Sequence, residues 1–131
     1  MGVRRRLWVL VAVAAALTAA DLAQKAARPV YGHPRGLAFM LVAALLATAL
    51  IVFVPRVPSL ALSVCGGVAA AGALGNLLAA LAWKDGVPNP IVAGAVAFNV
   101  ADVYAAVGAF SLIVGATVFA VRHPALLRQP I

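Results

Sequence analysis

The chain has 131 residues, of which 66% are hydrophobic and only 10% are charged, and its mean hydropathy is +1.10. A soluble globular domain is about 45–50% apolar and about 25% charged, so this chain has too few polar side chains to cover a water-facing surface. The net charge of +7 does not predict nucleic-acid binding, because the basic residues are scattered and no aromatic residues interleave with them to stack on bases. The composition predicts a single membrane domain over residues 1–131, with the membrane as a partner and no nucleic acid.

Apolar runs of about 20 residues predict membrane-spanning helices. The expected spans are about residues 7–27, 36–54, 60–83 and 91–121, and the second is ended by the PRVP segment at 55–58. The fourth run is long enough to tilt or to lose a turn at one end. We therefore expect an all-α membrane protein with four transmembrane helices.

The basic residues of the connections predict the orientation, because Lys and Arg gather on the cytoplasmic side. With the N-terminus inside, the outer side holds Arg28, Arg35 and Lys84, with Lys25 near that end of the first span. The inner side holds a larger set: Arg4, Arg5, Arg6, Arg56, Arg122 and Arg128. We expect both termini to be cytoplasmic. An alternative is that residues 4–21, a basic start followed by an apolar run and small residues, form a secretory signal that is cleaved after Ala20.

Asp21, Asn76 and Asp102 are strongly polar side chains within the apolar spans. At 1.5 Å per residue, Asp21 and Asn76 are expected roughly 21 Å and 24 Å above the inner ends of their spans, and Asp102 roughly 16 Å below the outer end of the fourth. All three are thus expected at or above the middle of the membrane on the outer side, where three helices bring them together. An Asp at the centre of a spanning helix costs about 2.5–3.5 kcal/mol on insertion scales, so these residues should face the bundle interior.

Each acid has a potential partner in the sequence. Lys25 follows Asp21 by one helical turn and can neutralise it, and this pair needs no further function. Asn99 precedes Asp102 by one turn, and Asn76 can supply a second amide. Asp102 is either a functional carboxyl or part of a structural hydrogen bond between helices.

Other reactive side chains do not form a pattern of known chemistry. His33 and His123 lie in flanking segments without partners at metal-ligand spacing, so we expect no metal site and no cofactor. Cys65 is the single cysteine and cannot form an internal disulfide. The serines lack a His–Asp arrangement for nucleophilic catalysis.

Four segments, taken in order, resemble the motifs of one membrane-protease family. They are DLAQK at 21–25, PRGLAF at 34–39, GALGNLLAA at 72–80 and FNVAD at 98–102. They resemble, respectively, the D-x-x-x-K, N-x-G-x-A-F, G-x-x-G-N-x-x-D-R and F-N-x-A-D motifs of lipoprotein signal peptidase, also called signal peptidase II. The chain resembles a divergent member of this family over most of its length.

The resemblance implies a four-helix aspartic protease of the bacterial cytoplasmic membrane. Such a protein cleaves the signal peptide from prolipoproteins once a diacylglyceryl group is attached, so a prolipoprotein signal peptide or lipid is the implied partner. Asp102 matches one of the family's two catalytic aspartates. The supporting or substrate-binding positions match Asn99, Asn76, Asp21 and Lys25.

The sequence departs from the family at its chemistry. Pro34 stands where the family has Asn, and Ala79–Ala80 replace its acid–arginine pair. The segment between the first two spans, which the family uses to cradle substrate, is brief. The family's second catalytic aspartate lies in a V-x-D-F segment, where this chain has GVPNPI at 86–91, so that Asn89 or Pro90 takes its place.

Asp85, 17 residues before Asp102, is the one acid near that position. It is either the second carboxyl of a realigned pair or a solvated loop residue followed by a turn glycine. Aspartic proteolysis needs two carboxyls that share a proton, and Asn cannot exchange one.

Three functions follow as alternatives. The first is a signal-peptidase-II-like aspartic endopeptidase acting through Asp102 and Asp85. The second is a non-catalytic relative that binds a signal helix or lipid. The third is a small proton-coupled transporter that uses Asp21 or Asp102 as a relay, against which the FNVAD segment and the lack of an internal repeat both argue.

Overall fold

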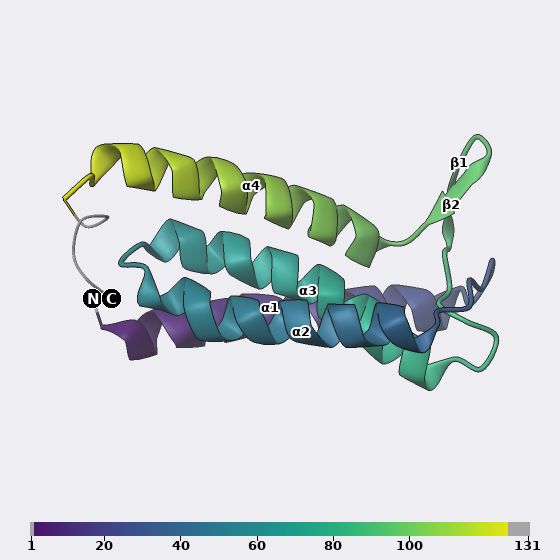
Figure 1. The fold of residues 1–131 in the computed structure, drawn as a ribbon. Helices are drawn as coiled ribbons and strands as arrows, with labels where there is room; N and C mark the ends of the chain where they lie inside the picture. Colours follow the sequence, from purple (N-terminus) through teal and green to yellow (C-terminus); the bar gives the residue numbers. More distant parts are fainter. Residues whose placement is uncertain (1, 126–131) are drawn as a thin grey trace.

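The computed structural model describes residues 2–125, which form four long helices and one small β-hairpin (Figure 1). All four helices are long and apolar enough to cross a membrane, as the sequence predicts. The helices are α1 (Val3–Ala27), α2 (Leu37–Phe53), α3 (Leu60–Ala82) and α4 (Val100–Arg122). A 3₁₀ turn, η1 (Val54–Arg56), follows α2, and the strands β1 (Ile91–Ala93) and β2 (Val96–Phe98) precede α4.

Helix α3 lies between α4 and the α1–α2 pair and contacts all three of the other helices (Figure 1). Its close approach to α4 depends on glycine. A Cβ atom on Gly72 would collide with the backbone of Ala105, and one on Gly108 would collide with the backbone of Ala69. Such small residues allow two helix backbones to approach closely in a membrane. The polar residues of α3 and α4 are thereby brought within hydrogen-bonding reach.

The outward faces of the helices are apolar. Leu45 on α2 and Phe110 on α4 are each 70% exposed. The interior, in contrast, contains small residues and several polar side chains. This arrangement is the reverse of that in a soluble bundle and fits a protein whose solvent is lipid.

Local sequence fixes the helix ends. Pro55 lies in the 3₁₀ turn after α2, where its ring and missing N–H prevent continuation of the α-helix. Ser59 is the N-cap of α3, and its hydroxyl oxygen accepts a hydrogen bond from the Leu62 backbone N at 3.3 Å. Helices α2 and α3 are therefore separated by a short turn and run in opposite directions.

The fourth helix begins at Val100, so the expected span over residues 91–121 is wrong at its N-terminal end. Residues 91–98 form the antiparallel hairpin β1–β2, in which Ile91 pairs with Phe98 and Ala93 with Val96. Gly94 supplies a positive φ of 61° at the turn. The chain is mostly helical, and this hairpin corrects the expectation that it is entirely so.

The bundle has two distinct ends (Figure 1). The start of α1, the end of α2, the start of α3 and the end of α4 lie at one end, called the basic end because it holds Arg4, Arg5, Arg6, Arg56 and Arg122. Arg128, which the sequence also places there, lies outside the described residues. The opposite end, called the site end, holds the hairpin and the connections 28–36 and 83–99.

The two connections at the site end pair with each other. His33 N donates to Val87 O at 2.9 Å and Val87 N donates to His33 O at 3.0 Å. Asn89 N donates to Val30 O at 2.9 Å. Gly86 lies beside this pairing with φ of 96°, and a Cβ there would collide with the His33 backbone. The pairing fixes the backbone of the segment that leads to Asn89.

Candidate functional site

An ion pair on α1 forms the innermost part of the site. Lys25 Nζ lies 2.7 Å from Asp21 Oδ2, and both side chains are completely buried. The predicted pairing of these two residues is confirmed. Lys25 Nζ also donates to Gly75 O at 3.2 Å and to Asn76 Oδ1 at 3.1 Å, so the ammonium group has three acceptors. The pair is therefore tied to α3 as well as neutralised within α1.

Asp21 also contacts the start of α4. Its second oxygen, Oδ1, accepts a hydrogen bond from the Ala101 backbone N at 2.9 Å. The first turn of a helix has N–H groups without intrahelical partners and carries partial positive charge, so a carboxylate there is favourable. Gly75 makes this approach possible, because a Cβ on it would lie 2.5 Å from Asp21 Oδ2. Asp21 thus joins α1, α3 and α4 at one point.

Asp102 lies in the first turn of α4, and both of its carboxyl oxygens accept hydrogen bonds. Oδ2 accepts from Asn99 N at 3.0 Å, while Asn99 Oδ1 accepts from Asp102 N at 3.1 Å, which is a reciprocal capping box. Oδ1 accepts from Asn76 Nδ2 at 2.8 Å. The predicted contact of Asp102 with both asparagines is confirmed. The predicted depth of Asp102 below the end of its helix is wrong, because α4 begins only two residues before it.

Depths along the other two helices agree with a site near the same end. Asp21 and Asn76 each precede the last residue of their helix by six positions, or about 9 Å of helix. The polar side chains therefore meet close to the site end of the bundle and not at the middle of the helices.

Asn89 extends the site into the connection between α3 and α4. Asn99 Nδ2 donates to Asn89 Oδ1 at 2.8 Å, and both side chains are buried. The resemblance left the position of the missing carboxyl open between Asn89 and Pro90, and the contact with Asn99 identifies Asn89 as the side chain that reaches the site. Sequence reasoning did not foresee the bond to Asn99. The available signal was an amide between two prolines in an otherwise apolar segment.

The contacts form one continuous hydrogen-bonded network across three helices and a connection. In order, it runs through Asp21, Lys25, Asn76, Asp102, Asn99 and Asn89. It contains two carboxylates and one ammonium group. One carboxylate, Asp21, is paired directly with the ammonium, whereas Asp102 is held by hydrogen bonds from neutral groups.

A groove of about 220 Å³ opens beside Asp102 between α2 and α4, with α3 at its base. Asp102 and Asn76 form its polar part. The rest of its wall is apolar and is formed by Phe39, Val42, Ala43, Leu46, Gly72, Ala73 and Ala105. Because α2 and α4 are packed on α3 and not on each other, the groove can receive an apolar segment from the side of the bundle.

Asp85 lies in the turn after α3, where Gly86 N donates to Trp83 O at 3.2 Å. Its side chain is exposed, and within residues 2–125 it forms no hydrogen bond or ion pair with the network. It does not line the groove beside Asp102. Its role as a second catalytic carboxyl stays a prediction.

Within the described part of the chain, no cluster of three or more His, Cys, Asp or Glu residues is arranged to hold a metal ion. Comparison of the chain with protein-family models, with curated proteins and with solved structures finds no match.

Proposed function

We propose that this chain is a membrane protein of the signal-peptidase-II type that binds the apolar segment of a lipoprotein signal peptide in the groove between α2 and α4. The observation that carries the proposal is that a mostly apolar groove lies beside a carboxylate, Asp102, which is held by two asparagines. The order of the motifs in the sequence supports the family assignment.

The lack, among residues 2–125, of a second carboxyl in hydrogen-bond contact with Asp102 favours binding over hydrolysis. Aspartic proteolysis requires one ionised carboxyl to activate water and one protonated carboxyl to donate to the scissile carbonyl. Beside Asp102 the network supplies Asn99 and Asn89, which donate and accept hydrogen bonds but do not exchange protons. The Asp102 carboxylate can accept hydrogen bonds from backbone N–H groups of an extended segment that follows the signal helix, because those groups have no partner within a helix.

Binding is tested with a synthetic diacylglyceryl signal peptide and purified protein in neutral detergent micelles. Asp102→Asn removes a charged acceptor and should weaken binding by about 10–100-fold, since a hydrogen bond to a charged group contributes about 1.5–3 kcal/mol. Ala105→Leu fills the groove and should weaken binding by about tenfold, whereas Ala106→Leu, on the exposed face of the same helix, should not. Equal affinity of all four proteins contradicts the proposal.

Cleavage of the same peptide through Asp102 and Asp85 is the second candidate. It is favoured by one observation: Asp85 is exposed, unpaired among residues 2–125, and in the same connection as Asn89. Peptide hydrolysis that is lost in both Asp85→Asn and Asp102→Asn would establish this activity and exclude a purely binding role.

An engineered carboxyl provides a sharper comparison. Asn89→Asp keeps an oxygen that can accept from Asn99 and adds a second carboxyl to the network that holds Asp102. We expect this variant to gain peptide hydrolysis that depends on Asp102, while Asn89→Leu gains none. Hydrolysis by the unaltered chain at the rate of Asn89→Asp would show that Asn89 is not the substituted position.

We further propose that the basic end faces the cytoplasm of a bacterial cell and the site end faces outward, which puts both chain termini inside. The distribution of Arg and Lys supports this orientation. In a Cys65→Ala background, Ala95→Cys should react with a membrane-impermeant maleimide in intact spheroplasts, and Gly2→Cys only after permeabilisation. The reverse pattern would invert the orientation. Proton-coupled transport through Asp21 or Asp102 stays a prediction from the sequence.

A further inference from the structure

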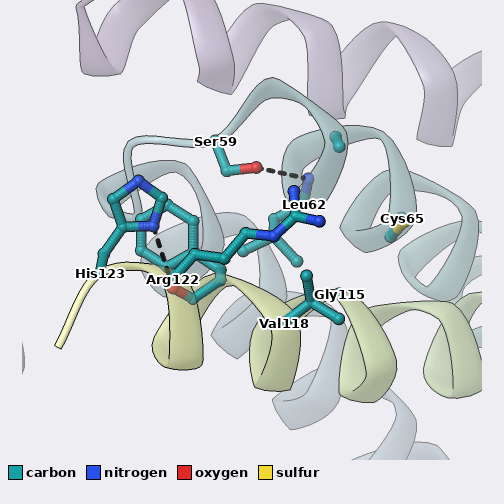
Figure 2. A pocket seen from close by; sticks show the side chains of 9 residues that line it. Ser59, Leu62, Cys65, Gly115, Val118, Arg122 and His123 are labelled. Atoms are coloured by element: carbon teal, nitrogen blue, oxygen red, sulfur yellow. Dashed lines mark hydrogen bonds between the residues drawn. The ribbon is translucent and has the colours of Figure 1, made fainter.

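A second groove, of about 320 Å³, lies at the basic end between the first turns of α3 and the last turns of α4. Figure 2 shows its residues from close by: Cys65 and Gly115 lie at one end and Ser59 and His123 at the other. Leu62, Val118 and Phe119 add apolar wall between them. The groove is therefore apolar along its length and polar at the mouth nearest the basic end.

Arg122 lies at this mouth, and its exposed side chain has no hydrogen-bond or ion-pair partner among the described residues, 2–125. The chain has only three acidic side chains, Asp21, Asp85 and Asp102, and all three lie toward the site end. The basic end thus has no acidic side chain close to it, which favours the binding of an anion there.

The start of α3 adds donors at the same mouth. The first turn of a helix leaves backbone N–H groups unpaired and carries partial positive charge. Ser59 Oγ accepts from Leu62 N and so satisfies one of these groups, and Figure 2 shows the Arg122 side chain extending toward this turn. A helix start and a guanidinium group directed at the same space form a favourable site for a phosphate.

We infer that this groove binds one phospholipid of the leaflet at the basic end, and that this lipid is anionic. An acyl chain lies along Leu62, Cys65, Gly115 and Val118, and the phosphate lies against Arg122 and the first turn of α3. The groove is apolar along the helices and positively charged at its mouth. An anionic lipid has the matching arrangement, with apolar chains inside the membrane and a charged headgroup at the membrane surface. The inference concerns a different end of the molecule from the site at Asp102 and does not depend on it.

Cys65 provides a reporter inside the groove, because it is the single cysteine of the chain and lines the groove wall. Purified protein in neutral detergent is treated with N-ethylmaleimide, and the rate of Cys65 modification is measured with added lipid. We expect phosphatidylglycerol to slow the reaction. Diacylglycerol, which lacks the phosphate, and inorganic phosphate, which lacks the chains, should each protect Cys65 much less.

Variants identify the headgroup contact. Arg122→Gln should raise the phosphatidylglycerol concentration needed for half-protection by about fivefold, the effect expected for one basic residue at an anionic lipid surface. Arg56→Gln is the matched control, since Arg56 is exposed at the same end but does not line this groove, and it should leave half-protection unchanged. Helical circular dichroism that is equal in the three proteins shows that the comparison is between folded states.

A second variant tests the acyl-chain contact. A Cβ on Gly115 would lie 2.9 Å from Leu62 Cδ2, so Gly115→Leu fills the groove while leaving Arg122 in place. Native mass spectrometry should then show less bound phosphatidylglycerol than for the unaltered chain. Protection by diacylglycerol equal to that by phosphatidylglycerol would overturn the inference, as would protection that is unchanged in Arg122→Gln. Full protection by inorganic phosphate alone would replace the lipid with a soluble anion.

Discussion

Asn76 and Asp102 join the two most closely packed helices: Asn76 Nδ2 on α3 donates to Asp102 Oδ1 on α4 at 2.8 Å. The opposite end of the same amide, Oδ1, accepts from Lys25 Nζ on α1 at 3.1 Å. One asparagine therefore links the buried ion pair to the carboxylate beside the groove, and this link determines how the site responds to substitution.

Replacing Asn76 with Leu should lower the free energy of unfolding by about 1–3 kcal/mol, because both Lys25 and Asp102 lose a buried hydrogen-bond partner. Chemical unfolding in mixed micelles, followed by circular dichroism, measures the change. Thr117→Ala is the control: Thr117 is exposed and bonds only to the carbonyl of Ile113 one turn earlier on its own helix. A cost for Asn76→Leu no larger than that of the control would show that the network does not stabilise the bundle.

Lys25→Met should be more costly, about 3–5 kcal/mol, because it leaves the carboxylate of Asp21 buried without its counter-charge. The double variant Asp21→Asn with Lys25→Met removes both charges and should recover a large part of that loss. The same chemical unfolding measurement, made on Lys25→Met and on the double variant, gives the two free energies to compare. If the double variant is less stable than Lys25→Met, then Asp21 is held mainly by the Ala101 backbone and not by Lys25.

Gly75→Ala should destabilise the bundle by about 1–3 kcal/mol, since the added methyl group overlaps Asp21 Oδ2 in a packed interior. Gly36→Ala is a matched control, because a Cβ there meets no atom within 4 Å. Thermal unfolding of both variants should show a lower midpoint for Gly75→Ala only. A neutral Gly75→Ala would mean that α1 and α3 can separate without loss.

The start of α4 at Val100 predicts that the β1–β2 hairpin lies outside the hydrocarbon core. In a Cys65→Ala background, Ala95→Cys in reconstituted vesicles should react quickly with a water-soluble maleimide, because the reactive thiolate forms in water. Ala106→Cys, exposed on the lipid-facing side of α4, should react slowly. Slow reaction at both positions would restore the longer fourth span that hydropathy alone predicts.

The amino-acid pattern was sufficient to predict the solvent, the helices and the main polar partners. Lipid as the solvent follows from the shortage of charged residues, and three of the four helix ranges follow from uninterrupted apolar runs. The Asp21–Lys25 pair was predictable because it depends only on the spacing of one helix. These features are local, and local chemistry is enough to fix them.

The fourth helix shows where hydropathy fails even though a local signal existed. Residues 91–98 are as apolar as a spanning helix, so a hydropathy window includes them. The Asn99–Asp102 spacing is that of an N-cap and its third helical residue, which is a start signal for a helix at Val100. Hydrophobicity and capping gave different boundaries, and the hydrogen bonds of the cap decided the outcome.

Only the tertiary structure shows that Ala101 N donates to Asp21 and that Asn99 donates to Asn89. The grooves beside Asp102 and Arg122 are likewise visible only in the tertiary structure. The Asp21–Ala101 contact joins residues that are 80 positions apart, and its geometry depends on how closely three helices pack. The packing distance depends on Gly72 and Gly108, which face the backbone of the neighbouring helix, and on Gly75, which faces the Asp21 carboxylate. In the sequence, each of these glycines indicates only a small residue. The sequence therefore determined which polar groups must find partners inside the membrane, and the helix packing decided which partners they found.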